Sequence, residues 1–178
     1  MVLIKQTHTP QTIAADIDTE MIEEKIGEVL GLEMAAQKAV EQLVSKGLLD
    51  KKGIKQQVEE IRKEAHNHQT QIEDLCKKMS SSEKSAIKID SEKVKSKATE
   101  TEKKASQMMQ TYLGNDADTS EALEFLCIAE GGELTHYEVL DAMIKDVKDT
   151  EFADKVKSIL NEEREHLQEC IQLARQNI

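Results

Sequence analysis

Residues 22–43 read IEEKIGEVLGLEMAAQKAVEQL, and their apolar side chains recur every three or four positions, which is the period of one face of an α-helix. This face comprises Ile22, Ile26, Val29, Ala36, Val40 and Leu43. Gly47 follows the last of them, where glycine commonly ends a helix. Three further windows have the same period, so we predict an all-α fold with main helices at about 18–46, 54–79, 119–148 and 151–176.

The composition agrees with this prediction. The 178 residues suit a single domain, and 2% aromatic residues with one proline and no tryptophan favour helices over strands. Apolar runs stay shorter than the ~20 residues of a membrane span, and a net charge of -11 argues against a nucleic-acid partner. We find no secretory signal, and the three cysteines lack CxxC spacing, so we expect a cytoplasmic protein with free thiols.

The connections between the predicted helices indicate their arrangement. Residues 47–53 and 148–150 are short connections, so each pair of helices should form an antiparallel hairpin. Residues 80–118 are too long for an ordinary loop. We therefore predict a four-helix bundle at 18–178, after an N-terminal arm at 1–17, with a long crossover that lets the second and third main helices run parallel. Within the crossover, residues 91–113 are predicted to form a loosely docked helix.

Two features of the sequence concern the surfaces of these helices. Residues 77–104 hold nine lysines and five acidic residues, which gives +4 against -15 for the rest of the chain. We favour a solvated basic helix packed on the acidic bundle over an arm that binds an acidic partner. Gly27, Gly31 and Ala35 form a row of small residues that predicts close approach of another helix, either the crossover or a second subunit.

Polar residues interrupt the apolar faces near the middle of each main helix. They are Glu33, Glu64, His68, Glu130, Glu133, Glu163 and His166. Antiparallel hairpins of similar length bring these middles to one level, so the side chains should form one buried layer. No Lys or Arg lies on these faces, and an unpaired buried charge costs on the order of several kcal/mol. Because two divalent cations would compensate the carboxylates, we predict a two-metal site, with misread solvated faces as the alternative.

The last main helix shows the spacing that such a site requires. Glu163 and His166 are three residues apart and point to the same side of the helix. His166 can then bind one ion while Glu163 bridges both. The neighbouring acids Glu162 and Glu165 are expected to face solvent.

The second main helix lacks this spacing. Glu64 and His68 are four residues apart, which is compatible with one face, and we prefer this pair as ligands. His66 points about 200° away from His68, so we expect it at the surface.

The third main helix adds a tyrosine and two glycines to the predicted layer. Tyr137 is a candidate catalytic residue that could hydrogen-bond a metal ligand or carry redox chemistry, with an ordinary core tyrosine as the alternative. Gly131 and Gly132 separate Glu130 from Glu133, and each glycine costs the helix about 1 kcal/mol. Either the helix loosens there, which we favour, or a neighbouring backbone packs close.

Three segments together resemble the ferritin-like superfamily, especially the di-iron domain of rubrerythrins. They are EVLGLEMAAQKAVEQL at 28–43, AEGGELTHYEVL at 129–140 and ILNEEREHLQEC at 159–170. The resemblance implies two iron ions, although carboxylate and imidazole ligands also suit manganese and zinc. It further implies a carboxylate and a histidine for each ion, two bridging carboxylates and one mobile carboxylate. The terminal pairs are Glu33 with His68 and Glu130 with His166, the candidate bridges are Glu64 and Glu163, and the mobile residue is Glu133.

The function implied by this resemblance is that of an oxidoreductase that reacts ferrous iron with peroxide or oxygen. The chain lacks the paired CxxC segments of the rubredoxin part of full rubrerythrins, so electrons would come from an external donor protein. We expect a homodimer. The alternatives are an iron-storage or ferroxidase protein and a non-catalytic helical interaction protein.

Overall fold

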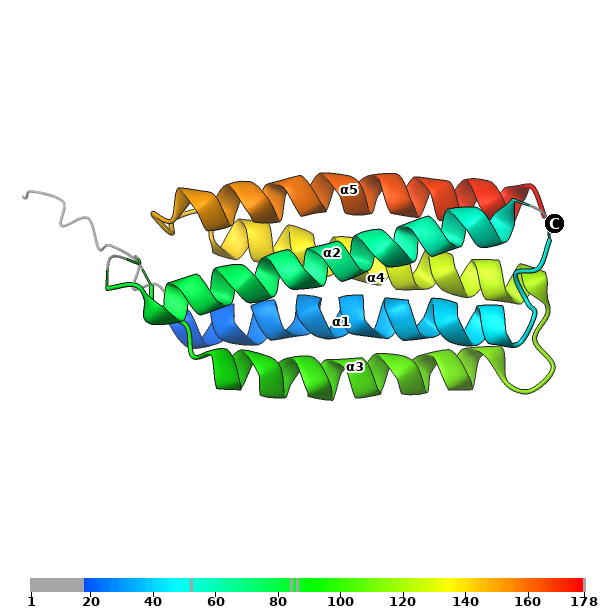
Figure 1. Ribbon diagram of the computed structural model, residues 1–178, viewed down its shortest axis with the longest axis horizontal. Coiled ribbons are helices and arrows are strands. Elements are labelled where there is room, and N and C mark those ends of the chain that lie inside the picture. The colour runs from blue at the N-terminus through cyan, green and yellow to red at the C-terminus, as the bar shows by residue number, and fades with distance from the viewer. Residues whose placement is uncertain (1–17, 52, 84, 86, 178) are drawn as a thin grey trace, which may run out of the picture.

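The computed structural model describes residues 18–51, 53–83, 85 and 87–177, so the predicted arm at 1–17 lies outside the described residues. The described residues form five helices and no strand (Figure 1): α1 (Thr19–Ser45), α2 (Ile54–Ser81), α3 (Ser91–Leu113), α4 (Thr119–Met143) and α5 (Thr150–Arg175). The predicted all-α class is confirmed. Among these helices, none carries an apolar stretch sufficient to cross a membrane.

Aspartate side chains begin four of the five helices. The caps are Asp18, Asp90, Asp118 and Asp149, each of which accepts a hydrogen bond from the backbone of the first helical turn. At α4 the Glu121 side chain also accepts from the Asp118 backbone N–H and so completes a capping box. Such caps contribute about 1 kcal/mol each, so the helix starts are fixed locally by the sequence.

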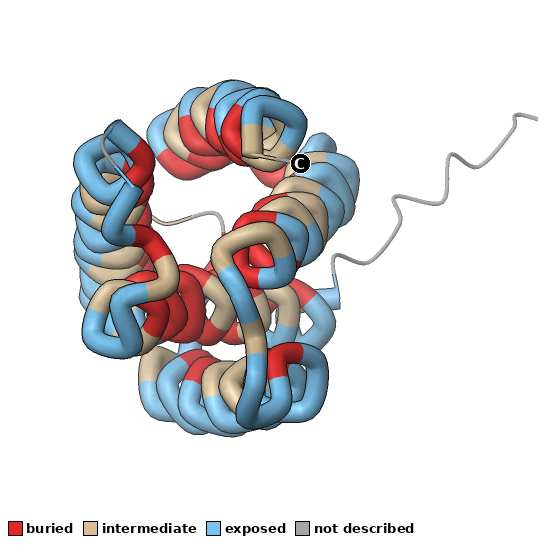
Figure 2. The backbone as a smooth tube through the Cα atoms, turned by 90° about the vertical axis from the view of Figure 1, so that its right-hand side faces the viewer, coloured by how far each residue is buried: buried red, intermediate tan, exposed pale blue. Residues whose placement is uncertain are grey.

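The helices lie side by side, as Figure 1 shows. In that view α1 and α2 are antiparallel, α4 and α5 are antiparallel, and α2 and α4 run in the same direction. α1 contacts α2, α3 and α4, and α5 contacts α2 and α4. Buried residues line the facing sides of the helices, while exposed residues cover their outer sides (Figure 2). α3 packs mainly on α1, so α1 is covered on two opposite sides.

The row of small residues on α1 accommodates α3. A Cβ atom added to Gly31 would lie 2.5 Å from the carbonyl oxygen of Ala98, and one added to Gly27 would lie 2.8 Å from the carbonyl oxygen of Val94. Only glycine allows the α3 backbone this close. Of the two predicted uses of this row, the structure shows packing of the crossover helix.

The lysine-rich helix α3 faces acidic residues of α1. Lys97 of α3 lies 3.6 Å from Glu28 of α1, and in the opposite sense Lys38 of α1 forms an ion pair with Glu102 of α3 at 2.7 Å. Lys93 lies 3.7 Å from the buried Glu23, whose carboxylate also accepts a hydrogen bond from a backbone N–H at the start of α3. The predicted packing of this lysine-rich helix on the rest of the chain is therefore confirmed.

α4 ends at Met143, before the predicted end at residue 148. The predicted helix was too long because the apolar pattern includes Ile144 and Val147. Both residues are buried, but they lie in the turn that leads to α5. The Val147 N–H donates to the Ile144 carbonyl at 2.9 Å. Asp149 caps the start of α5, so the chain reverses direction in the residues between Met143 and Asp149.

The apolar core consists of two clusters. One contains Ile22, Ile26, Tyr137 and Phe152 among others, and the second contains Val40, Leu43, Leu126 and Leu173 among others. Along α1, Glu33 falls between the residues of the first cluster and those of the second. The core is therefore interrupted where the sequence predicts a polar layer.

Candidate metal centre

Seven polar or charged side chains are buried among the described residues. One is Glu23, and the other six belong to the predicted layer: Glu33, His68, Glu130, Glu133, Glu163 and His166. Each of the six is at most 4% exposed. They come from α1, α2, α4 and α5, so the layer joins both antiparallel hairpins.

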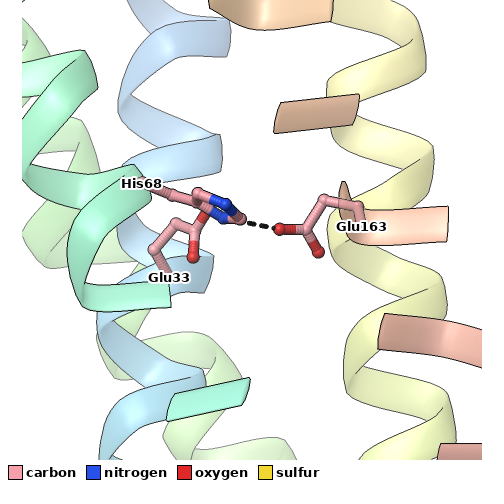
Figure 3. Close-up of side chains that lie close together, drawn as sticks. All are labelled: Glu33, His68 and Glu163. Atoms are coloured by element: carbon pink, nitrogen blue, oxygen red, sulfur yellow. Dashed lines mark ion pairs between the residues drawn. The ribbon is translucent and has the colours of Figure 1, made fainter. Parts of the chain in front are cut away.

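Three of these side chains form a first group, drawn in Figure 3. His68 Nδ1 lies 2.9 Å from Glu163 Oε1 and 3.3 Å from Glu33 Oε1. The three potential ligand atoms all lie within 4.8 Å of one another, which is close enough to bind a single metal ion. The structure thus brings His68 into the layer, while His66 is exposed and contacts Gln37.

A second group shares one residue with the first. It contains Glu130, Glu163 and His166, again with ligand atoms within 4.8 Å of one another. His166 Nδ1 lies 3.6 Å from Glu130 and 3.8 Å from Glu163. The rings of His68 and His166 are stacked with centroids 5.7 Å apart. Glu163 therefore lies where it can serve two ions, as its spacing from His166 predicts.

The outer nitrogen of each histidine contacts a carboxylate from the opposite hairpin. His68 Nε2 on α2 lies 3.1 Å from Glu162 of α5, and His166 Nε2 on α5 lies 2.7 Å from Glu64 of α2. These contacts orient both rings with Nδ1 toward the layer. Glu64, which the sequence suggests as a bridge, therefore lies outside both groups, and Glu162, expected to face solvent, contacts a candidate ligand.

α2 and α5 differ at one position of the layer, which explains why α2 lacks the Glu–His spacing of three residues found on α5. Residues 64–68 read EAHNH and residues 162–166 read EEREH, so both segments carry a glutamate four residues before a histidine. Ala65 stands where α5 has Glu163, and it is buried. α2 thus supplies an outer carboxylate and a histidine but no shared carboxylate. The repeated ExxxH spacing was the signal in the sequence for Glu162.

Tyr137 and Glu133 extend the layer on α4. The Tyr137 hydroxyl donates a hydrogen bond of 2.7 Å to Glu33 Oε1, and its ring is fully buried. Glu133 is buried but belongs to neither group, and its side chain has no hydrogen bond or ion pair with any other residue that the structure describes. α4 is continuous through Gly131 and Gly132, and a Cβ atom added to either meets nothing within 4 Å, so neither predicted role of these glycines is seen.

Burial and mutual repulsion shift the protonation of the layer. Burial raises the pKa of Glu130 and Glu133 well above the ordinary value, and neighbouring carboxylates add to the effect. Burial also raises the pKa of Glu163, with a further contribution from Glu33. Burial alone would lower the pKa of His68, but the carboxylates of Glu163 and Glu33 raise it to about 11. The layer therefore retains protons that a metal ion would displace.

Several buried atoms of the layer have no hydrogen-bond partner among the described residues. They are Glu33 Oε2, His68 Nδ1, Glu130 Oε2 and both oxygens of Glu163, and of these His68 Nδ1 and Glu163 Oε1 form the 2.9 Å ion pair described above but no hydrogen bond. Such atoms are costly to leave unpaired inside a protein, and they belong to the ligand groups. The residues present therefore fit metal ions. No protein-family model, curated protein or solved structure matches the chain, so the assignment rests on this geometry.

Proposed function

We propose that this protein is a di-metal oxidoreductase of the ferritin-like, rubrerythrin type, with α1, α2, α4 and α5 as its four-helix bundle and α3 as the crossover helix. One observation carries the proposal: two buried groups of carboxylate and imidazole ligands share Glu163. No Lys or Arg side chain is buried among the described residues to neutralise these carboxylates. Iron is the proposed metal because of the resemblance to rubrerythrins.

Each group supplies three protein ligands to one ion. Glu33 and His68 would hold the first ion and Glu130 and His166 the second, with Glu163 as a ligand available to both. Three protein ligands leave coordination positions open for a small oxidant. When bound, two ferrous ions would supply the two electrons that, with two protons, reduce hydrogen peroxide to two waters.

The outer carboxylates set the proton position on each histidine. An ion bound at Nδ1 of His68 requires the ring proton on Nε2, and Glu162 accepts a hydrogen bond from that atom. Glu64 does the same for His166. Tyr137 acts through Glu33: its hydroxyl occupies Oε1 and leaves Oε2 free for the ion. Glu64, Glu162 and Tyr137 are thus positioning residues in this proposal.

Anaerobic ferrous loading tests the proposal. The wild-type protein should retain about two irons per chain after gel filtration, and hydrogen peroxide should oxidise them faster than iron free in the same buffer. His68→Ala removes a ligand of the first ion only, so about one iron should remain. Glu165→Gln is the matched control, since Glu165 is exposed on α5 and belongs to neither group.

Fewer than about one iron per chain in the wild type would refute a two-metal centre, and it would favour a helical interaction protein. Manganese or zinc retained in preference to iron would refute iron as the metal. Aerobic uptake of many irons per chain by a large assembly would instead indicate storage.

A further inference from the structure

A pocket of about 180 Å³ lies between α1, α3 and α4. Apolar side chains make up most of its lining, with Ala36 from α1, Met109 from α3 and Phe125 from α4. Met108 and Ile128 also line it and are 64% and 48% exposed, so the pocket reaches the protein surface at these residues. It is therefore an apolar cavity with an opening between α3 and α4.

Glu133 supplies the unpaired polar group of this pocket. Three polar side chains line it, and two of them are already engaged: Ser106 Oγ donates to Glu102 at 3.2 Å, and His136 Nδ1 lies 2.9 Å from the carbonyl oxygen of Gly132. Glu133 is 3% exposed and has no hydrogen bond or ion pair with any other residue of the described chain. A buried carboxyl group without a partner favours a ligand that donates a hydrogen bond to it.

Gly132 keeps the pocket open beside Glu133. A Cβ atom added to Gly132 would meet nothing within 4 Å, although this residue lines the pocket. Close helix packing therefore does not require glycine there, and glycine costs an α-helix about 1 kcal/mol relative to alanine. The empty space next to the carboxyl group is the feature that a ligand can occupy.

We propose that this pocket binds a small uncharged molecule with an apolar body and one hydroxyl group, which donates a hydrogen bond to Glu133. An apolar protein cavity of about 150 Å³ binds benzene, so a pocket of about 180 Å³ has room for one ring or a short chain. A carboxyl group accepts such a hydrogen bond whether it is ionised or protonated. Protein residues form the whole lining of the pocket, so binding there does not require a bound metal ion. The proposal therefore goes beyond the proposed function.

Benzyl alcohol and toluene are suitable probes because they differ mainly in the hydroxyl group. NMR titration of the full-length protein with benzyl alcohol to about 10 mM should approach saturation, since fragments of this size bind with Kd values of about 1 mM. Toluene is titrated to its solubility limit, and its Kd is obtained by fitting the partial shift. The amide signals of Phe125 and Gly132 should shift. Benzyl alcohol should bind about tenfold more tightly than toluene, which is the effect of one hydrogen bond to an otherwise unpaired buried carboxyl group.

Three variants locate the binding. Gly132→Leu should fill the pocket and abolish binding of both probes. Gly131→Leu is its matched control, because Gly131 also has free space around it but does not line the pocket. Glu133→Leu should remove the preference for the alcohol and keep toluene binding. Binding unchanged by Gly132→Leu, shifts confined to residues outside the pocket, or no binding to the wild type would each overturn the proposal.

Discussion

Glu163→Gln should remove most of the stabilisation that metal ions give to this protein, because Glu163 is the only side chain common to both ligand groups. A ligand at 100 times its Kd stabilises the folded state by about 2.7 kcal/mol, so two ions contribute about 5 kcal/mol. For a chain of this length, each kcal/mol shifts Tm by about 2–4 °C, which gives about 10–20 °C for the wild type.

The same substitution should act in the opposite direction without metal. Burial and the nearby Glu33 raise the pKa of Glu163, so the ionised carboxylate is unfavourable in the folded state and its replacement by a neutral amide relieves that cost above neutral pH. The assay is thermal unfolding at pH 8, with a chelator and with anaerobic ferrous iron. Glu33→Gln and Glu130→Gln each leave one group intact and should keep about half of the shift.

An equal metal-induced shift in Glu163→Gln and wild type would refute the shared-ligand argument. A variant that unfolds early in both conditions would show a general folding role for Glu163 instead. The exposed Glu165 on the same helix provides the control, and Glu165→Gln should match the wild type in both conditions.

Three further outcomes follow from the geometry. The stability of the metal-free protein to urea should fall as the pH rises from 7 to 9, because the pKa of His68 is raised to about 11 and the folded state therefore binds a proton that the unfolded state has lost. The loss should be about 1.4 kcal/mol per pH unit for each such proton. Stability that rises with pH would contradict this. Gly31→Ala should destabilise by about 1–3 kcal/mol in urea because the new Cβ would lie 2.5 Å from a carbonyl oxygen of α3, whereas Gly131→Ala, with free space, should stabilise by about 0.5–1 kcal/mol. Tyr137→Phe should weaken metal binding at the Glu33 group about tenfold or more by competition titration, and unchanged affinity would assign Tyr137 to packing alone.

The helical period in the sequence was sufficient to predict the all-α class and six of the seven predicted positions of the buried layer, with the half-exposed Glu64 as the exception. A carboxylate such as Glu33 in a row of apolar residues is informative because burying a charged group costs free energy. Its position on an apolar helix face therefore distinguishes it from the acidic residues of the solvated faces. The small-residue row containing Gly31 indicated close packing, but it did not identify the packing partner. That choice depends on tertiary arrangement, and the structure places the carbonyl oxygen of Ala98 there.

The roles of Glu64 and Glu162 could not be predicted from one helix at a time. Both side chains are half-exposed, at 43% and 47%, so their positions resemble ordinary solvated sites. Each contacts a histidine of the other hairpin, and that contact depends on how α2 and α5 are rotated about their axes. Sequence periodicity fixes which face of a helix is apolar, but not which residue at its edge meets a partner.

The crossed contacts also give the buried layer of glutamates and histidines a structural role. α2 and α5 share far fewer contacts than the two helices of either hairpin share with each other. The contacts between these two helices include His68 with Glu162 and Glu163, and His166 with Glu64. Ions held by His68, His166 and Glu163 would add further links at the same level. Metal binding should therefore couple α2 to α5, and the ligand variants should lose cooperativity of unfolding between the hairpins as well as metal.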